Sequence, residues 1–470
     1  MIKSNLIGRE IESRLLEELY DSGKAELVAI YGRRRVGKTF LVKSLFMNRF
    51  DFFVTGKYKG TKKDELEAFH GKLKEYSKFP YPVPGSWKEA FEQLRHYIDN
   101  LDKERVVVFI DEIPWLDTPR SKFVSEFDSF WNDWASTQQK LMVIICGSAT
   151  TWMNKNVIQQ RGGLHGRCTR KIKLPQFSLK ETEMFLKSKN IVWNRHQIAE
   201  CYMIMGGTPY YLDMLQKGWS LPQNIDFLFF RRDAELRGEY SILMDSLFRD
   251  SKIYHQVITL LAKHSKGMTR QEIMSALGIA DGGVFSDVLK NLVNCDFLRD
   301  YAAFGKKERD TMYQLTDMFV LFYLKFIKNN GGADENFWTN SIDSPSRRAW
   351  SGYAFEQLCL NHIPQIKESL GIRGVLSNVC SWSQPGSQID MLIDRRDQVI
   401  NICEEKFSVT PYVITKKYLD EMLARMENFR EATRTRSALH LTMIVASGLA
   451  RNEYSGAVQS VVTLDSIFEK

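Results

Sequence analysis

Two glycines, a lysine and a threonine follow one another at a spacing that could bind phosphate groups. They lie in the run GRRRVGKT, from Gly32 to Thr39, which has the pattern G-x-x-x-x-G-K-T. In such a loop the backbone N–H groups surround phosphate oxygens, the lysine reaches the β- and γ-phosphates, and the hydroxyl binds Mg²⁺. The sequence therefore predicts a site for ATP and Mg²⁺. We expect it to be formed by Gly32, Arg33, Arg34, Arg35, Val36, Gly37, Lys38, Thr39 and Phe40.

Two carboxylates follow a second apolar run. The segment RVVVFIDE predicts a buried parallel strand whose carboxyl end lies at the ligand edge of a sheet. We expect Asp111 to complete the Mg²⁺ shell and Glu112 to orient or deprotonate the attacking water. A third apolar run, LMVIICGS, ends at Ser148, which would contact the γ-phosphate. The alternative for Ser148 is a Gly-Ser pair that serves only the turn.

A further set of polar residues near the C-terminus could bind a divalent cation. In the run QIDMLIDRRDQVINICEEKF, a hairpin turn centred on Asp397 would place Asp390 opposite Glu404. The same turn would place Gln388 opposite Lys406, so that all four side chains share one face. Opposed carboxylates repel unless a cation such as Mg²⁺ lies between them, and we expect Asp390 and Glu404 to hold it. A shift of the turn by one residue would break this arrangement.

The chemistry expected at this second set is the hydrolysis of a phosphodiester. The cation would lower the pKa of a bound water. Lys406 would orient that water or stabilise the negative charge that develops on phosphorus. Glu356 would be supplied from an amphipathic helix that precedes the hairpin.

The elements that must position these residues follow from apolar periodicity. A strand over 26–31 (ELVAIY) leads into the phosphate-binding loop, and the helical run FLVKSLF follows it. Near the C-terminus we expect a helix over 349–370, strands near 374–382, 387–394 and 398–407, a helix near 412–430 and a strand over 439–446.

The middle of the chain has the element order of a winged helix-turn-helix. Thr269 and Glu272 form a capping-box pattern that begins its second helix. Its third helix, over 284–293, carries Lys290 as its one basic residue, against Asp287. A helix that reads DNA bases normally offers several basic or amide side chains. This favours a regulatory or inter-domain scaffold over direct base readout.

Length and composition fit an ordinary globular protein with several domains. The chain has 470 residues, of which 44% are hydrophobic and 26% are charged, and this excludes a largely disordered or fibrous protein. Its seven cysteines contain no C-x-x-C pair, so neither a disulfide framework nor a zinc site is indicated. The first residues do not resemble a signal peptide, and no apolar run reaches the roughly 18 residues that span a bilayer. We expect a cytoplasmic protein with no membrane partner.

The net charge of +8 lies in one segment of the chain. Between Lys155 and Arg195 there are ten basic and two acidic residues, and this excess equals the net charge of the whole chain. A basic surface indicates an anionic partner such as a nucleotide or DNA. Because the segment follows the third strand of the ATP site, we expect it to serve ATP first.

Several short motifs resemble those of AAA-related ATPases of archaeal type, which are close to the signal-transduction NTPases. Besides the IDE and CGS strand ends, the matching pieces are IGRE (Ile7 to Glu10), LHGR (Leu164 to Arg167) and GGTPYY (Gly206 to Tyr211). The resemblance implies that Gly8 and Arg9 lie near the base of the nucleotide. It also implies an arginine finger or sensor, for which Arg167 is the first candidate and Arg161 the second. The alternative is that Arg167 belongs only to the basic lid surface.

The C-terminal set resembles the PD-(D/E)xK nuclease signature. Asp390, Glu404 and Lys406 match it, with Glu356 on the preceding helix, and Ile389 stands where the signature has its proline. The resemblance implies metal-assisted DNA cleavage with these four residues as the catalytic set. The alternatives are a scaffold of the same fold without activity and a hairpin that is merely salt-bridged.

These observations predict an α/β protein with a mostly parallel P-loop sheet, a helical lid, a winged helix and a C-terminal sheet domain of restriction-endonuclease type. The expected segments are an ATPase core (1–175), a lid (176–249), a winged-helix domain (250–328), a linker (329–348) and a nuclease-like domain (349–470).

The leading functional hypothesis is an ATPase that uses Mg²⁺ and ATP and is coupled to a DNA nuclease. The alternative is a nucleotide-gated switch whose C-terminal domain binds nucleic acid or a protein without cutting. A third and weaker hypothesis is an ATPase that remodels peptides. An arginine finger that acts in trans would require a homo-oligomer.

Overall fold

The computed structural model describes residues 6–148, 151–158, 164, 166–248, 251–280, 282–306, 310–330 and 334–469. The chain forms two compact units, residues 1–176 and 177–470. The first unit corresponds to the segment expected to be the ATPase core. The expected lid, middle segment, linker and C-terminal domain all lie in the second unit.

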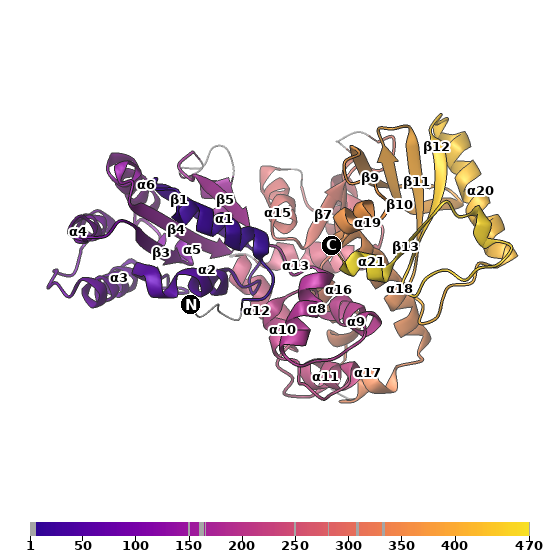
Figure 1. The fold of residues 1–470 in the computed structure, drawn as a ribbon, viewed down its shortest axis with the longest axis horizontal. Coiled ribbons are helices and arrows are strands. Elements are labelled where there is room, and N and C mark those ends of the chain that lie inside the picture. The colour runs from indigo at the N-terminus through magenta and orange to yellow at the C-terminus, as the bar shows by residue number, and fades with distance from the viewer. Residues whose placement is uncertain are drawn as a thin grey trace. The chain divides into compact units, whose positions relative to one another are not determined.

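A five-stranded parallel sheet forms the centre of the first unit, with the strand order β2-β3-β4-β1-β5. Its middle strands β3 and β4 are buried along their whole length, because helices cover both faces of the sheet (Figure 1). This confirms the predicted α/β fold with a parallel sheet. The strands are β1 (Glu26–Gly32), β2 (Phe50–Thr55), β3 (Val106–Asp111), β4 (Leu141–Ser148) and β5 (Arg170–Lys173).

Two apolar clusters pack on opposite faces of this sheet. One surrounds Leu16 and Leu41, on α1 and α2, with Ile30 of β1 between them. The other surrounds the aromatic rings of Trp87 and Phe127 on α4 and α6. The helices are α1 (Glu10–Tyr20), α2 (Lys38–Phe46), α3 (Lys62–Ser77), α4 (Trp87–Asp99), α5 (Ile113–Leu116), α6 (Phe123–Asp133) and α7 (Thr151–Met153).

The second unit begins with a group of helices that contact its C-terminal part. The backbone N–H of Leu179 donates to Nε2 of His362 at 3.1 Å, and the rings of His196 and Phe407 stack with centroids 4.2 Å apart. The predicted lid helices are therefore bound to the C-terminal domain. They are α8 (Leu179–Ser188), α9 (Arg195–Met205), α10 (Pro209–Asp213), α11 (Leu221–Ile225) and α12 (Glu239–Leu247).

The middle segment follows the element order that the sequence predicts. The capping box of Thr269 and Glu272 begins its second helix, as predicted. A three-stranded sheet with the order β6-β8-β7 completes the segment. Its elements are α13 (Ser251–Leu261), β6 (Met268–Thr269), α14 (Arg270–Leu277), α15 (Gly283–Asn294), β7 (Leu298–Tyr301) and β8 (Met312–Leu315), and α16 (Met318–Phe322) follows.

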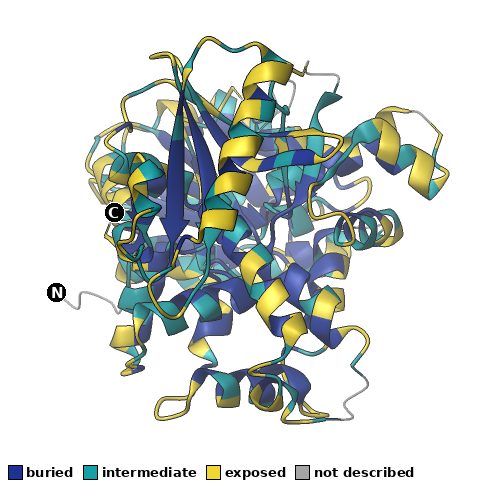
Figure 2. Cartoon of the chain, turned by 90° about the vertical axis from the view of Figure 1, so that its right-hand side faces the viewer, coloured by how far each residue is buried: buried dark blue, intermediate teal, exposed yellow. Residues whose placement is uncertain are grey.

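A second five-stranded sheet, with the order β13-β12-β11-β10-β9, forms the C-terminal part. Strands β9, β10 and β11 are antiparallel, whereas β11, β12 and β13 are parallel. The central strands β11 and β12 are mostly buried, while helix α20 exposes its outer face (Figure 2). The strands are β9 (Ser377–Gln384), β10 (Ser387–Arg395), β11 (Val399–Lys406), β12 (Ala438–Val445) and β13 (Ser460–Thr463); the helices are α18 (Pro345–Asn361), α19 (Ile363–Ser369), α20 (Lys416–Thr433) and α21 (Leu464–Phe468).

The segment predicted to be a linker, 329–348, is anchored by buried residues in its described part. Trp338, on α17 (Phe337–Asn340), is fully buried, and its backbone N–H donates to the carboxylate of Asp226 at 2.7 Å. Arg347 is also buried and forms an ion pair with Glu200 on α9. Polar composition concealed these anchors, because one large aromatic residue is enough to fix a short segment in a core.

The helix that carries Glu356 also differs from its prediction. Helix α18 begins at Pro345, a position in the first turn that suits proline, and ends at Asn361. A separate helix α19 begins at Ile363, with Pro364 in its first turn. In the described residues, no helix is long and apolar enough to cross a membrane.

Candidate functional site

The phosphate-binding loop lies between β1 and α2, where two glycines allow its backbone path. Gly32 has φ +156°, and a Cβ there would lie 2.3 Å from the carbonyl oxygen of Leu174. Gly37 has φ +90° and precedes the first residue of α2. A side chain at Gly32 would therefore separate the loop from β5, and one at Gly37 would strain the start of the helix.

Behind the loop, Lys38 and Thr39 are fixed by contacts inside the first unit. The ammonium of Lys38 donates to the carbonyl oxygens of Gly32 and Arg33, at 3.2 and 2.8 Å. The hydroxyl of Thr39 lies 3.1 and 2.9 Å from the two carboxylate oxygens of Asp111. A hydroxyl next to a carboxylate is a donor set that Mg²⁺ accepts, so these two side chains fit the predicted metal role.

Two acidic residues end β3 in an environment that changes their acidity. Burial raises the pKa of Asp111, and the hydrogen bond from Thr39 opposes this effect. Burial also raises the pKa of Glu112, while the charge of Lys38 lowers it. Glu112 has φ +47° and stands directly before α5, so the chain turns sharply after β3. Ser148 ends β4 beside Gly32, as expected of a residue at the phosphate edge.

The remaining residues predicted to bind the nucleotide are divided between the interior and the surface. Arg9 is buried, and its guanidinium donates to the carbonyl oxygens of Val36 and Pro175 at 3.2 and 2.7 Å. It therefore supports the loop from within the unit, and the preceding Gly8 has φ +68°. Arg33 and Val36 are buried, whereas Arg34 and Arg35 are half-buried and Phe40 is exposed.

Arg167 forms an ion pair with a helix of the first unit. Its Nε lies 3.1 Å from a carboxylate oxygen of Asp128 on α6, and its side chain is 45% exposed. The second candidate for an arginine finger, Arg161, lies outside the described residues.

In the C-terminal sheet, the hairpin has the predicted register. Ile393 pairs with Asn401 and Asp394 with Ile400, so the turn is centred on Asp397. The antiparallel pairing of β10 with β11 continues to Met391. Up to this point the sequence placed the two strands correctly.

Beyond Met391, a β-bulge changes which side chains share a face. The register between β10 and β9 shifts between Ile389 and Leu392, and both residues pack in the apolar cluster around Phe429 of α20. Asp390 lies inside the bulge and lines a cavity instead. The expectation that simple alternation carries Asp390 to the face of Glu404 is therefore wrong.

Glu404 and Lys406 contact helix α20. The hydroxyl of Tyr418 donates to Glu404 at 2.6 Å, and the guanidinium of Arg425 forms an ion pair with Glu404 at 2.5 Å. The ammonium of Lys406 lies 4.7 Å from the centre of the Tyr418 ring. Neither Glu404 nor Lys406 lines the cavity that contains Asp390.

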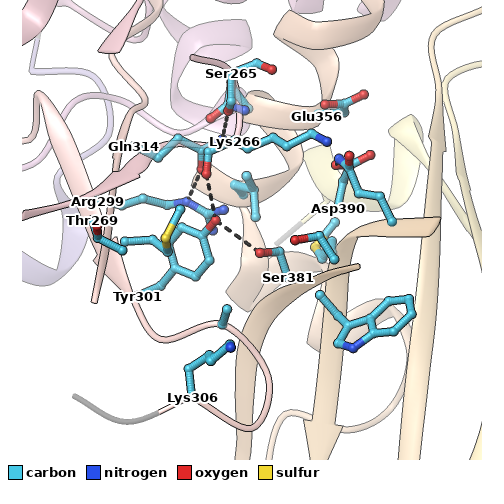
Figure 3. Close-up of a pocket in the computed structure, with 18 of the residues that line it drawn as sticks. Ser265, Lys266, Thr269, Arg299, Tyr301, Lys306, Gln314, Glu356, Ser381 and Asp390 are labelled. Atoms are coloured by element: carbon cyan, nitrogen blue, oxygen red, sulfur yellow. Dashed lines mark hydrogen bonds between the residues drawn. The ribbon is translucent and has the colours of Figure 1, made fainter. Parts of the chain in front are cut away.

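Glu405 lines the same cavity as Asp390, although the sequence pattern did not indicate it as a site residue. A cavity of about 550 Å³ is lined by Glu356, Asp390 and Glu405 together. Figure 3 shows Glu356 and Asp390 in this cavity. Glu405 alternates with Glu404 along β11 and so faces α18, which packs against that strand. The signal was the doubled acid in the run EEK, since a strand with two adjacent glutamates presents one to each face.

Burial and neighbouring acids raise the pKa values of Glu356 and Glu405. Burial raises the pKa of Glu356 to about 7, and the negative charges of Asp390 and Glu404 add to this while Lys406 opposes it. Burial raises the pKa of Glu405 well above its ordinary value, and the charge of Glu356 adds to this effect. Among the described residues, no three His, Cys, Asp or Glu side chains are grouped closely enough to hold a metal ion. A cation bound here would need the side chains to rotate toward one another.

Comparisons with known proteins support a nucleotide-binding role for the first site. Residues 6–215 match a family described as an ATPase domain predominantly from Archaea. The match includes the whole P-loop unit and extends to the helices α8 to α10 of the second unit. Residues 6–215 are therefore similar to ATPase domains of archaeal type, and this similarity supports nucleotide binding at the P-loop.

Individual relatives are more distant. The Methanocaldococcus jannaschii protein MJECL04 is 26% identical over 393 residues, which cover 82% of this chain and 83% of that protein. The Walker-type ATPase PABY2304 of Pyrococcus abyssi is 18% identical, with 68% of this chain and 96% of that chain covered and a TM-score of 0.49. The Aeropyrum pernix ORC2 protein, in complexes with ADPNP and ADP, is 14% identical, with coverage of 69% and 94% and a TM-score of 0.41.

Proposed function

We propose that the protein hydrolyses ATP at the P-loop and couples this reaction to a metal-dependent DNA nuclease in the second unit. The cavity in which Glu356, Asp390 and Glu405 meet is the observation that carries the nuclease half. Thr39 directly follows the P-loop lysine, and its contact with Asp111 supports the ATPase half of the proposal.

At the P-loop, each residue has a distinct task. Lys38 contacts the β- and γ-phosphates, and Thr39 and Asp111 hold Mg²⁺, which neutralises charge on the phosphate oxygens when it is bound. Glu112 orients the attacking water, and its raised pKa favours acceptance of a proton from that water. Ser148 contacts the γ-phosphate from the neighbouring strand end.

In the cavity, the proposed reaction is hydrolysis of a phosphodiester. The oxygen of a water molecule bonds to phosphorus, the bond from phosphorus to the leaving oxygen breaks, and that oxygen takes up a proton. A divalent cation supplies a water of lowered pKa when it is bound. Asp390 and Glu405 are the proposed ligands, while Glu356, whose pKa is about 7, exchanges protons near neutral pH.

Glu404 and Lys406 have a positioning role in this proposal. Their contacts with Tyr418 and Arg425 fix the end of β11 against α20, so that Glu405 faces the cavity. Part of the middle segment also acts as a scaffold. Phe304, in the loop between β7 and β8, packs edge-on against Phe429 of α20, with ring centres 5.0 Å apart and ring planes at 65° to each other. In a winged helix this loop is the wing, and here it is engaged with the C-terminal sheet.

A second candidate function is a nucleotide-gated switch that binds DNA or a protein without cutting. The ion pair of Glu404 with Arg425 favours it, because one acid of the expected signature is already neutralised inside the protein. The lack of a ready metal group among the described side chains points the same way.

The test combines both activities in one preparation. The full chain is incubated with linear and circular DNA and with Mg²⁺ or Mn²⁺, with and without ATP, while phosphate release is followed. We expect ATP turnover and cleavage that requires the cation. Asp390→Asn should abolish cleavage and leave ATP turnover intact, with Asp394→Asn, four residues along the same strand, as the matched control. DNA that stays intact with every metal would establish the switch.

A further inference from the structure

The cavity of the second unit has two walls that come from distant parts of the chain. One wall is the C-terminal domain, with Glu356 of α18, Asp390 of β10 and Glu405 of β11. The other is the middle segment, which contributes Lys266 and Arg299 (Figure 3). A site built on the C-terminal sheet alone would lack these two positive charges.

Lys266 extends from the middle segment toward the carboxylates. Figure 3 shows its side chain directed at Glu356 and Asp390. Within the described parts of the chain, no carboxylate lies within 4.0 Å of its ammonium to form an ion pair. Positive and negative groups thus face one cavity without neutralising each other, and a ligand that brings both signs of charge would complement them.

The backbone around Lys266 is held firmly. The following Gly267 has φ +78°, and a Cβ there would lie 2.5 Å from the carbonyl oxygen of Tyr313, so no other residue type fits. The hydroxyl of Tyr301 donates to the carbonyl oxygen of Lys266 at 3.0 Å and accepts from Ser381 of β9 at 3.1 Å. This chain of hydrogen bonds fixes the position of Lys266 relative to the C-terminal sheet.

Arg299 strengthens the same wall. Its Nε donates to Gln314 at 2.5 Å, and Gln314 in turn donates to the carbonyl oxygen of Ser265. The guanidinium also lies 4.2 Å from the centre of the Tyr301 ring. Arg299 is therefore a fixed positive charge beneath the turn that carries Lys266.

Buried oxygens on the opposite wall point to a missing ligand. The side chain of Gln357 is 1% exposed and lines the cavity, and its Oε1 has no hydrogen-bond partner among the described residues. Oε1 of Glu405 is likewise buried without a partner in the described chain. Buried oxygens without donors are costly, and a bound cation or a donor group of a ligand would satisfy them.

We propose that this cavity binds the sugar-phosphate backbone of a DNA strand and that Lys266, supplied by the middle segment, contacts the phosphate. The carboxylate wall receives the cation that accompanies that phosphate, and Gln357 accepts from the nucleotide or from the hydrated cation. This inference rests on the proposed action of the second unit on DNA. It assigns to Lys266 the place at the phosphate that the sequence pattern gives to Lys406.

The test measures how DNA binding depends on salt. The full chain, with Ca²⁺ as the probe cation, is titrated with fluorescent single-stranded and duplex oligonucleotides over a range of salt concentrations. Loss of one phosphate contact should lower the slope of log affinity against log salt by about 0.7 for single strands and about 0.9 for duplexes. Lys266→Ala should show this change and weaken binding roughly five- to tenfold at about 0.1 M salt.

Two further variants separate charge from structure. Lys266→Arg retains the positive charge, so the slope of log affinity against log salt should stay close to that of the wild-type chain. Lys263→Ala removes an exposed lysine three residues away that does not line the cavity, and it should leave the slope unchanged.

Cleavage is measured on the same preparations with Mg²⁺ and Mn²⁺. Binding that depends on Lys266 without any cleavage supports the binding site and refutes the nuclease. If Lys266→Ala changes neither cleavage nor binding, the proposed phosphate contact of Lys266 is wrong, while the proposed nuclease activity stands. A wild-type chain that binds no DNA overturns both.

Discussion

The ATP site and the cavity of the second unit both place carboxylates at or near strand ends, but they are assembled in different ways. At the ATP site, Gly32 to Thr39 are contiguous, and Asp111 is already hydrogen-bonded to Thr39. In the cavity, Lys266, Glu356 and Asp390 come from three separate segments, and the carboxylates have not closed on one another. The residues of the first site are therefore already in contact, whereas the carboxylates of the second are not grouped closely enough to hold a metal ion in the described chain.

This difference has an electrostatic consequence. The charge of Lys38 lowers the pKa of both Asp111 and Glu112 and so opposes the effect of burial. Glu356 is influenced more by burial and by neighbouring acids than by any cation, and its pKa rises to about 7. A cation that bound beside Glu356 would therefore compete with a proton on that carboxyl group.

Removal of the P-loop lysine should have the largest effect. In Lys38→Ala, ATP hydrolysis is expected to fall about 10²- to 10³-fold, because a fixed positive charge at the phosphates is lost. Phosphate release measures this, with the exposed Lys24→Ala as the control. Cleavage of DNA should lose its response to ATP while DNA binding persists. Turnover within a few-fold of the wild-type chain would refute the assignment of the site.

The pH dependence of stability should distinguish the cavity from the ATP site. Because the pKa of Glu356 is raised to about 7, the folded state binds more protons than the unfolded state between its ordinary value and 7. Its contribution therefore lowers stability as pH rises through this window, by up to about 3 kcal/mol at 1.4 kcal/mol per unit. We expect Glu356→Gln to reduce the change in stability between about pH 5 and pH 7.5. Thermal unfolding in EDTA at the two pH values measures this change.

A control substitution at an exposed glutamate tests whether the pH dependence of stability is specific to Glu356. Glu67, on α3 of the first unit, is exposed, and Glu67→Gln should leave the pH dependence as it is in the wild-type chain. Addition of Ca²⁺ should stabilise the wild-type chain more at the higher pH, since the cation competes with the proton on Glu356. An equal stabilisation at both pH values would show that no cation binds beside Glu356.

Separate substitution of the two adjacent glutamates of β11 should distinguish the positioning role of Glu404 from the proposed catalytic role of Glu405. Glu404→Gln breaks the ion pair with Arg425 and should cost about 1–3 kcal/mol of stability, because a buried charged partner is lost. Glu405→Gln should leave stability unchanged or higher, because a neutral amide replaces a carboxylate that burial disfavours. DNA cleavage should fall more than about tenfold in Glu405→Gln and less in Glu404→Gln.

The control for this pair is Glu421→Gln, an exposed position on α20 that should affect neither property. The opposite pattern, with cleavage lost in Glu404→Gln and retained in Glu405→Gln, would show that the catalytic face is the one with Glu404 and Lys406, as the sequence predicts. Thermal unfolding and a gel assay of cleavage report on the two properties separately.

The sequence predicted those parts of the fold whose signals are local. The P-loop glycines, the apolar strand before Asp111 and the hairpin centred on Asp397 each occupy one short run, and the structure has them where they were expected. The capping box at Thr269 is equally local. Regular alternation and fixed spacing suffice wherever no irregularity intervenes.

The parts that could not be predicted depend on long-range packing. The bulge at Asp390 is evident only from the pairing of β10 with β9, where β10 advances three residues, from Ile389 to Leu392, while β9 advances two. The burial of Trp338 depends on a contact with Asp226, more than a hundred residues away in sequence. Lys266 reaches the cavity only because Tyr301 and Ser381 join the two walls.

The smallest effect concerns Arg167, which tests whether the ATP site is complete within one chain. Its exposed ion pair with Asp128 is worth about 0.2–1 kcal/mol, so Arg167→Ala and Asp128→Asn should lower stability equally and only slightly. A finger that acts in trans would make ATP turnover per chain rise with protein concentration, and Arg167→Ala would remove that rise. Asp128→Asn frees the same arginine without deleting it and should keep the rise. Equal turnover in both variants and in the wild-type chain would show that Arg167 takes no part in ATP hydrolysis.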